Sequence, residues 1–303
     1  LIVDGYMQGE NAMYVEYTIS NGYSLVNNGS VTVNGVLELP QYAPTGEDGV
    51  AVTSSADAVM TYSGVAFLPR NLGTGTYGTL ILEGDGSQVN FAEGSYDFYG
   101  EIKVAGNMTI TGQGIAVEAE DENEVTFVKS GTRIRHISGE NGDIANRLFN
   151  IVKTLEDGTT ETITVAISGM TVSDGSLAGG KGANIYAENV DLTLSEMQIR
   201  NGLIGTAEVR EDGKVITPAS VAADGFGGGI YYTGNSITAF DVTFDGNSAA
   251  NGAAIYLDMT SAFDAESGEE AEGSASLTDL TFNGTSVSGS GYLMDLNGNE
   301  NVT

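Results

Sequence analysis

The chain of 303 residues contains no cysteine, no tryptophan, one histidine and only four prolines. Without cysteine it can form no disulfide, no thiolate nucleophile and no cysteine-based zinc or iron–sulfur site. With His136 as its single histidine, a metal site built from several histidines is excluded as well. Thiol chemistry and histidine-rich metal chemistry are therefore ruled out by composition.

Cationic residues are also scarce. Lysine and arginine number 11 against 41 aspartate and glutamate residues, which gives a net charge of −30. Nucleic acids and anionic membrane surfaces require clustered cations, so we expect neither as a partner. No run of about 18 apolar residues occurs, so we expect no helix that spans a bilayer. The chain begins at Leu1 without a basic or apolar leader, and we interpret it as a mature protein or an excised segment.

Glycine, by contrast, is abundant, at 43 of 303 positions, about twice its usual frequency. Apolar runs are short, alternate with polar residues and are bounded by glycine, asparagine or aspartate, as in Ser30–Asn34 and Met108–Thr111. Such alternation, rich in valine, isoleucine and threonine, predicts β-strands.

One segment also has helical spacing, because Ile144, Leu148, Ile151 and Leu155 recur every three to four residues. We favour a strand over 148–152, since Asp157-Gly158 then forms a hairpin turn into residues 161–165. A helix remains the alternative there.

Two sequence elements repeat in the second half of the chain. The first carries the apolar anchors Val172, Ile199, Phe244 and Phe282, which are 27, 45 and 38 residues apart. The second has the form Gly-x-x-Ile-Tyr and carries Ile185, Ile230 and Ile255. Coils of roughly 20–27 residues with glycine or asparagine at their corners are units of a parallel β-helix. Because coils stack about 4.8 Å apart, we expect each set of anchors to form one internal ladder.

We therefore predict one all-β domain, a right-handed parallel β-helix with loop insertions at its corners. Residues 1–130 are expected to form irregular amino-terminal coils, with a loop-rich insertion or lateral subdomain near 41–76. Residues 131–303 carry the repeats, with further insertions at Leu203–Phe226 and Asp258–Ser274. A sandwich would account for the strands, but not for the period and the excess of glycine.

The pairing of Gly228-Gly229-Ile230-Tyr231 with Phe244-Asp245-Gly246-Asn247 resembles the repeat of chlamydial polymorphic outer-membrane proteins and related autotransporter-like bacterial adhesins. The resemblance covers about residues 131–295. It implies a β-helix of the pectate-lyase type, displayed outside a bacterial cell, that serves adhesion or structural display without catalytic residues. The implied partner is a glycan or protein on a host or neighbouring cell.

Parallel β-helices also carry polysaccharide lyases and hydrolases, so we considered catalysis. The best local candidates are Arg133 and Arg135, which a strand places on one face, with Ile134 and His136 on the other. Two outward arginines could bind an acidic sugar; alternatively, they neutralise neighbouring carboxylates. We interpret His136 as a packed or surface residue rather than a catalytic base. We predict a non-enzyme, with a polysaccharide-binding or polysaccharide-cleaving protein as the alternative.

Ca²⁺ is the one cofactor that the acidic groups allow. Carboxylates cluster at 118–124 and at Glu83 and Asp85, but without the spacing of an EF-hand or a calcium β-roll, so we favour solvated corner loops.

Tyrosine is frequent, at 14 residues. Tyr186, Tyr231 and Tyr256 occupy equivalent repeat positions and are expected to stack, whereas other exposed tyrosines would suit recognition of glycans or proteins.

Location and assembly follow from the same features. A chain without cysteine can cross a membrane unfolded and fold outside, coil by coil, so we expect an extracellular or cell-surface location. The strand at Leu1, Ile2 and Val3, or the segment Tyr14–Ile19, could add to the open edge of another copy. The alternatives are thus an end-to-end homopolymer and a monomeric stalk segment. The charge of −30 opposes association, which should strengthen with salt or Ca²⁺.

Overall fold

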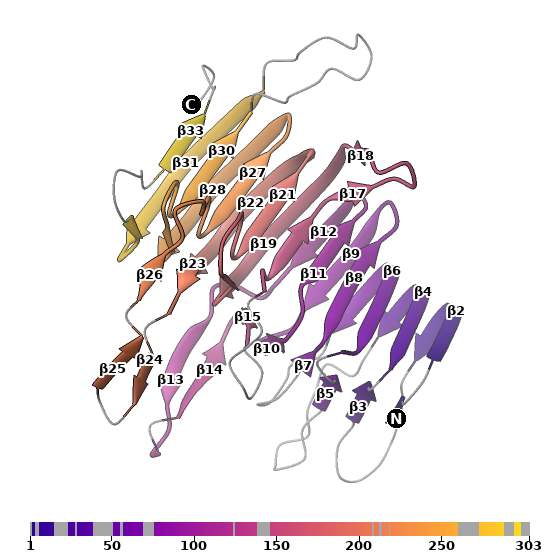
Figure 1. Ribbon diagram of the computed structural model, residues 1–303. Coiled ribbons are helices and arrows are strands. Elements are labelled where there is room, and N and C mark those ends of the chain that lie inside the picture. Colours follow the sequence, from indigo (N-terminus) through magenta and orange to yellow (C-terminus); the bar gives the residue numbers. More distant parts are fainter. Residues whose placement is uncertain are drawn as a thin grey trace.

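A computed structural model describes residues 2–3, 6–14, 24–27, 29–38, 51–54, 57–68, 76–123, 125–137, 146–207, 209–211, 214–217, 219–259, 273–287 and 294–297. Every regular element in these ranges is a β-strand, and most strands belong to one long stack of parallel pairings (Figure 1). Successive coils wind through three columns of strands, called sheets 1, 2 and 3 below. The structure is an all-β parallel solenoid, which confirms the predicted fold class.

The three sheets run side by side along the whole described length of the molecule. Sheet 1 contains β1 (Ile2–Val3), β3 (Ser24–Asn27), β5 (Ala51–Ser54), β7 (Thr76–Tyr77), β10 (Gly94–Phe98), β15 (Thr132–His136) and the second halves of β19 (Ile163–Ser173), β22 (Val190–Arg200), β28 (Ser236–Asp245) and β31 (Ser274–Asn283). Sheet 2 contains the first halves of β2 (Tyr6–Tyr14), β4 (Ser30–Glu38) and β6 (Val59–Leu68), then β8 (Thr79–Glu83), β11 (Ile102–Ala105), β16 (Phe149–Ile151), β21 (Ile185–Glu188), β27 (Ile230–Thr233), β30 (Ile255–Asp258) and β33 (Met294–Asn297). Sheet 3 contains the second halves of β2, β4 and β6, then β9 (Ser87–Phe91), β12 (Met108–Thr111) and the first halves of β19, β22, β28 and β31.

The two sets of apolar anchors each lie in one register. In sheet 1, the pairings run from Val172 to Ile199, Phe244 and Phe282 in turn. In sheet 2, Ile185 pairs with Ile230 and Ile230 with Ile255. All of these side chains except Phe282 are fully buried, and Phe282 packs against the same core. Alternate residues of each stacked strand point inward, so every coil adds its apolar positions to one continuous interior.

The expected insertion near 41–76 is wrong for the described residues 51–54 and 57–68. These residues form β5 and β6, which pair in register with the preceding coil. In the second half of β6 the outward residues Val65 and Phe67 are apolar and half-buried, and the inward residues are apolar and buried. No alternation therefore marked that half of the strand in the sequence. The amino-terminal coils thus continue the same sheets as the repeats.

The expected insertion at Leu203–Phe226 begins too early. Leu203 starts β23 (Leu203–Thr206), which stacks between β20 (Ser176–Leu177) and β29 (Ser248–Ala249) and belongs to a regular coil. With β32 (Ser286–Val287), these strands form a short fourth ladder between sheets 1 and 2. The outgrowth itself contains the hairpin of β24 (Val209–Glu211) and β25 (Lys214–Thr217), followed by β26 (Ser220–Val221), which pairs with β23. Most of the insertion expected at Asp258–Ser274 lies outside the described residues.

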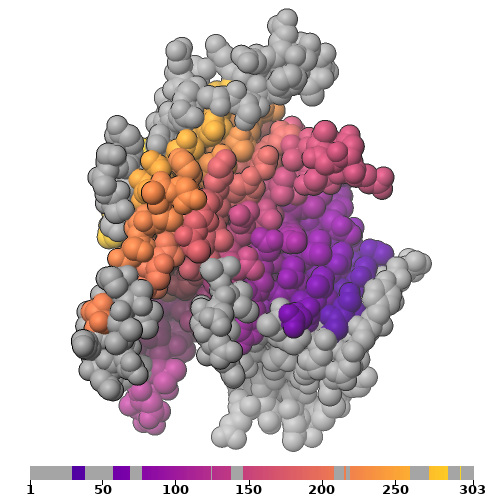
Figure 2. Space-filling view, viewed as in Figure 1, coloured from indigo at the N-terminus to yellow at the C-terminus, as the bar shows by residue number. Residues whose placement is uncertain are grey.

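Two further antiparallel hairpins project from the corners (Figure 2). One joins β13 (Val117–Glu120) to β14 (Thr126–Ser130), and the other joins β17 (Lys153–Thr154) to β18 (Thr160–Glu161). The second hairpin turns at Asp157-Gly158, where Gly158 has a φ of 85°, and it follows strand β16. The structure therefore confirms the predicted strand and turn and excludes the alternative helix in its described part, residues 146–155.

Candidate functional site

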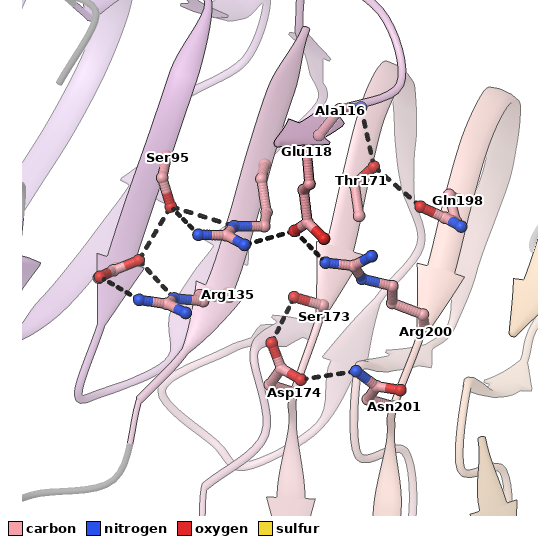
Figure 3. A network of polar contacts seen from close by, with 12 residues as sticks. Ser95, Ala116, Glu118, Arg135, Thr171, Ser173, Asp174, Gln198, Arg200 and Asn201 are labelled. Atoms are coloured by element: carbon pink, nitrogen blue, oxygen red, sulfur yellow. Dashed lines mark hydrogen bonds and ion pairs between the residues drawn. The ribbon is translucent and has the colours of Figure 1, made fainter. Parts of the chain in front are cut away.

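The two arginines singled out in the sequence lie on the outer face of β15, and both are paired within the chain (Figure 3). Arg135 donates from Nε and Nη2 to the two carboxylate oxygens of Asp97, at 2.8 and 2.9 Å. Arg133 donates to Ser95 Oγ from Nε at 3.2 Å and from Nη2 at 3.0 Å, and it forms an ion pair with Glu118. Arg200 forms a second ion pair with Glu118.

Both arginines are engaged by carboxylates, although the Arg135 side chain remains 35% exposed. The Arg133 side chain is only 6% exposed, because the β13–β14 hairpin folds its Glu118 over it. The hydrogen bonds that Arg135 donates to Asp97 are the main reason that the pKa of Arg135 is raised, so the guanidinium stays charged. Both arginines therefore neutralise neighbouring carboxylates, as the second interpretation expects, and binding of an acidic sugar by Arg133 and Arg135 stays a prediction. His136 is 3% exposed and lies on the inner face of the strand, with Ile134.

A different face carries the more open site. Tyr186, Tyr231 and Tyr256 point outward from β21, β27 and β30 and stand in one register of sheet 2. Successive rings are stacked, with centroids 5.4 Å apart and planes 7° from parallel in both pairs. The predicted tyrosine stack is therefore confirmed. Tyr231 lies between the other two rings and is only 3% exposed, so the stack presents mainly ring edges and hydroxyl groups to its surroundings.

A cavity of about 360 Å³ opens beside this stack. Tyr186 and Tyr231 line one side, and the outward residues two positions later in the same strands, Glu188, Thr233 and Asp258, form a second row. That volume is in the range of small-molecule sites, and the lining offers aromatic, hydroxyl and carboxylate groups together.

The wall of the cavity comes from the β17–β18 hairpin and the sheet 2 corner. Thr160 lies on β18, and Asn189 follows β21 with a φ of 54°. Asn189 donates from Nδ2 to the Thr160 carbonyl oxygen at 3.3 Å and accepts from Thr162 Oγ1 at 2.7 Å. The hairpin is thereby tied to the tyrosine-bearing sheet, which holds the cavity open as part of the fold.

Two cations from neighbouring corners rest against the tyrosines. The Arg147 guanidinium carbon lies 4.6 Å from the centroid of the Tyr186 ring, and Lys181 Nζ lies 4.5 Å from that of Tyr231. Lys181 Nζ also donates to the Tyr231 hydroxyl at 2.8 Å, while the Tyr186 hydroxyl donates to the Glu188 carboxylate. Burial, followed by the hydrogen bond to Glu188, raises the pKa of Tyr186 above its ordinary value, so this hydroxyl remains a donor.

Sequence reasoning identified the stack but missed the cavity. Tyrosines at equivalent repeat positions signalled the stack, whereas the cavity also requires Thr160, which lies on a hairpin outside the repeats. No group of three or more histidine, aspartate or glutamate side chains in the described ranges is arranged to hold a metal ion, so Ca²⁺ binding stays a prediction. Within the same ranges, no helix is long and apolar enough to cross a membrane.

Comparison with known proteins gave no support for any family. No family model matches the chain, and neither the curated proteins nor the solved structures gave a significant match.

Proposed function

We propose that the chain is a structural and adhesive segment of an extracellular or cell-surface bacterial protein, and that it binds a glycan beside its tyrosine stack. The observation that carries the proposal is the stack of Tyr186, Tyr231 and Tyr256 beside a 360 Å³ cavity on a continuous parallel solenoid. A solenoid whose coils each contact only their neighbours presents such a row on a stiff, extended surface.

The chemistry of the cavity favours a polyhydroxylated ligand. Glu188 and Asp258 provide carboxylate acceptors, and Thr160 and Thr233 provide hydroxyl groups. Sugar hydroxyls donate and accept hydrogen bonds at once, so a mixed lining of this kind satisfies them better than an apolar pocket would. Because the tyrosine ring faces are covered, recognition would occur through ring edges and hydrogen bonds rather than through stacking of a sugar on a ring.

Two further features support the adhesive role. The repeated Gly-x-x-Ile-Tyr element and the Phe-x-x-Asn element at residues 244–247 resemble those of bacterial surface adhesins. A chain without cysteine needs no oxidation step after export, and its coil-by-coil architecture suits folding outside the cell. We propose binding without turnover, so that the glycan is a partner and not a substrate.

A glycan and cell-surface array tests the binding function. We expect the wild-type chain to bind a subset of glycans and Tyr186→Leu, which keeps an apolar side chain but removes the ring and hydroxyl, to lose that binding. The matched control is Phe240→Leu, which removes an exposed aromatic ring from sheet 3, away from the cavity. Equal binding by wild type and Tyr186→Leu would refute the site, and new reducing ends or unsaturated products on incubation with polysaccharides would refute binding without turnover.

Protease treatment of intact cells that carry the native gene tests the location. We expect the protein to be digested while cytoplasmic markers survive. A chain that is protected until the cells are lysed would contradict the proposed surface display.

A further inference from the structure

The cavity beside the tyrosine stack carries more negative than positive charge. Two carboxylates, Glu188 and Asp258, line it against one cation, Lys181. Lys181 is already engaged by the ring and hydroxyl of Tyr231. The whole chain carries a net charge of −30, so the electrostatic potential of its surface is also predominantly negative.

The chain's own side chains show which charge this face attracts. Only 11 lysines and arginines exist in 303 residues, yet Arg147 and Lys181 both lie against the tyrosine stack. The negative face of an aromatic ring attracts cations, and a nearby carboxylate adds to that attraction.

We infer that the cavity recognises an amino sugar, a polyhydroxylated ring that carries a primary ammonium group, and that it disfavours uronic acids. This inference rests on the proposed glycan-binding function and names its ligand class. The ammonium group would lie against the Glu188 or the Asp258 carboxylate, which stand two coils apart, one on each side of Thr233. Ring hydroxyls would meet Thr160, Thr233 and the edge of the Tyr186 ring. A uronate would instead bring its carboxylate toward two like charges.

Titration calorimetry with four defined probes tests this selectivity. The probes are a glucosamine tetramer, its fully N-acetylated counterpart, a galacturonate tetramer and tetralysine. We expect the glucosamine tetramer to bind best, to weaken as salt rises, and to weaken when the pH exceeds the pKa of its amine. Glu188→Gln should lower its affinity about tenfold or more, because a charge-assisted hydrogen bond is replaced by a neutral one.

The matched control is Glu83→Gln. Glu83 is exposed at the end of β8 in sheet 2, the sheet that carries the tyrosine stack, and it does not line the cavity. This variant therefore removes one carboxylate of sheet 2 without changing the cavity. We expect it to bind the glucosamine tetramer as the wild type does. Asp258→Asn provides a second cavity variant, and thermal unfolding of each variant identifies any that lose binding through loss of the fold.

The outcomes separate this inference from the proposed function. Equal binding of the acetylated and free tetramers, with no effect of Glu188→Gln, would overturn the ammonium selectivity and leave glycan binding standing. Equal binding of tetralysine would overturn the sugar and retain only a cation site. Preference for the galacturonate tetramer would overturn the charge argument. Absence of binding to every oligosaccharide, here and on the array, would overturn both proposals.

Discussion

At the scale of single residues, two buried asparagines tie the coils together at the corner between sheets 1 and 2. Asn247 accepts from the Gly202 amide at 2.9 Å and donates to the Ile199 carbonyl at 2.8 Å. Asn184 donates to the Asn247 side-chain oxygen at 3.1 Å and accepts from the Gly175 amide at 2.9 Å. Both side chains are fully buried, so they satisfy backbone groups that water cannot reach. Asn247 is the asparagine of the Phe-x-x-Asn element at residues 244–247, which gives that motif a structural reason.

Replacing Asn247 with alanine should therefore destabilise the chain. The Gly202 amide and the Ile199 carbonyl would lose their partner inside the protein, at a cost of about 1–3 kcal/mol. Urea unfolding of Asn247→Ala measures the loss, with the exposed Gln88→Ala on β9 as the control. A urea midpoint equal to that of the control would show that the hydrogen bonds of the Asn247 side chain contribute nothing to stability.

A second group of single residues sets the bend between sheets 3 and 1. Gly169, Glu196, Asp241 and Asp279 are at equivalent positions in β19, β22, β28 and β31, with φ values of 66°, 54°, 52° and 53°. The left-handed conformation is unfavourable for residues that carry a Cβ, by roughly 1 kcal/mol. The bend thus turns one long strand from one sheet into the next, and three of its four copies carry strain.

Glu196→Gly should consequently stabilise the chain, by about 0.5–1 kcal/mol, because glycine adopts this conformation readily. The control is Thr193→Gly, three residues earlier on the same strand and also exposed, where glycine should destabilise by a similar amount. Thermal unfolding measures both. A destabilised Glu196→Gly would mean that the side chain does more than tolerate the bend.

At the scale of elements, the β13–β14 hairpin is fastened to sheet 1 by one carboxylate. Glu118 of β13 pairs with Arg133 of β15 and with Arg200 of β22, which are 15 and 82 residues away (Figure 3). Burial opposes ionisation of Glu118, but hydrogen bonds and charge attraction from Arg200 and Arg133 outweigh it, so the pKa of the carboxyl is lowered. The apolar side chains of Ile115, Val117, Val125 and Phe127 on and beside the hairpin are exposed. Val128 of β14 is buried, so this clamp and Val128 together attach the hairpin.

The pH dependence of the hairpin follows from that shift. A lowered pKa in the folded state means that the stabilisation is fully present above the unfolded value, about 4.3 for glutamate, and is lost as pH falls through the lower folded value. We expect the hairpin amides to lose protection against hydrogen exchange, corrected for intrinsic rates, as pH falls below about 4. Glu118→Gln should show that loss already at pH 7.

The matched control for the clamp is Glu122→Gln, at the exposed turn of the same hairpin. It should leave the exchange of the hairpin unchanged at pH 7. Protection that is equal in wild type, Glu118→Gln and Glu122→Gln would show that backbone contacts alone hold the hairpin.

At the scale of the whole molecule, the stacking that builds the solenoid is also a route to assembly. In the part of the chain that the structure describes, β1 pairs with β3 on one side, and β33 pairs with β30 on one side. Strands paired on one side can accept another strand. The segment Ile2–Val3 is such a strand, whereas Leu1 and residues 15–19 lie outside the described residues.

We predict that the purified 303-residue chain associates end to end, and more strongly as salt or Ca²⁺ screens its charge of −30. Light scattering and electron microscopy across a salt and Ca²⁺ series measure this. A chain of confirmed mass that stays monomeric throughout would exclude the homopolymer and favour the monomeric stalk segment.

The architecture was predictable from the sequence because its causes are local and periodic. Alternating apolar residues encode strands, glycine and asparagine encode corners, and the repeated anchors encode which strand stacks on which, as the pairing of Ile185, Ile230 and Ile255 illustrates. The same logic predicted the tyrosine stack. It failed for β6, because the outward residues Val65 and Phe67 in its second half are also apolar and are half-buried.

The chemistry of the surface was decided only by the tertiary structure. Whether Arg133 is exposed or paired depends on the β13–β14 hairpin, which brings Glu118 against it. The same carboxylate also pairs with Arg200, which is 82 residues away in the sequence. The cavity likewise needs Thr160 to meet Tyr186 and Tyr231 from another coil. The spacing of residues in the sequence does not predict these contacts, because hairpins outside the repeats can fold toward either side of a corner. Their direction is set by contacts that exist only once the coils have stacked.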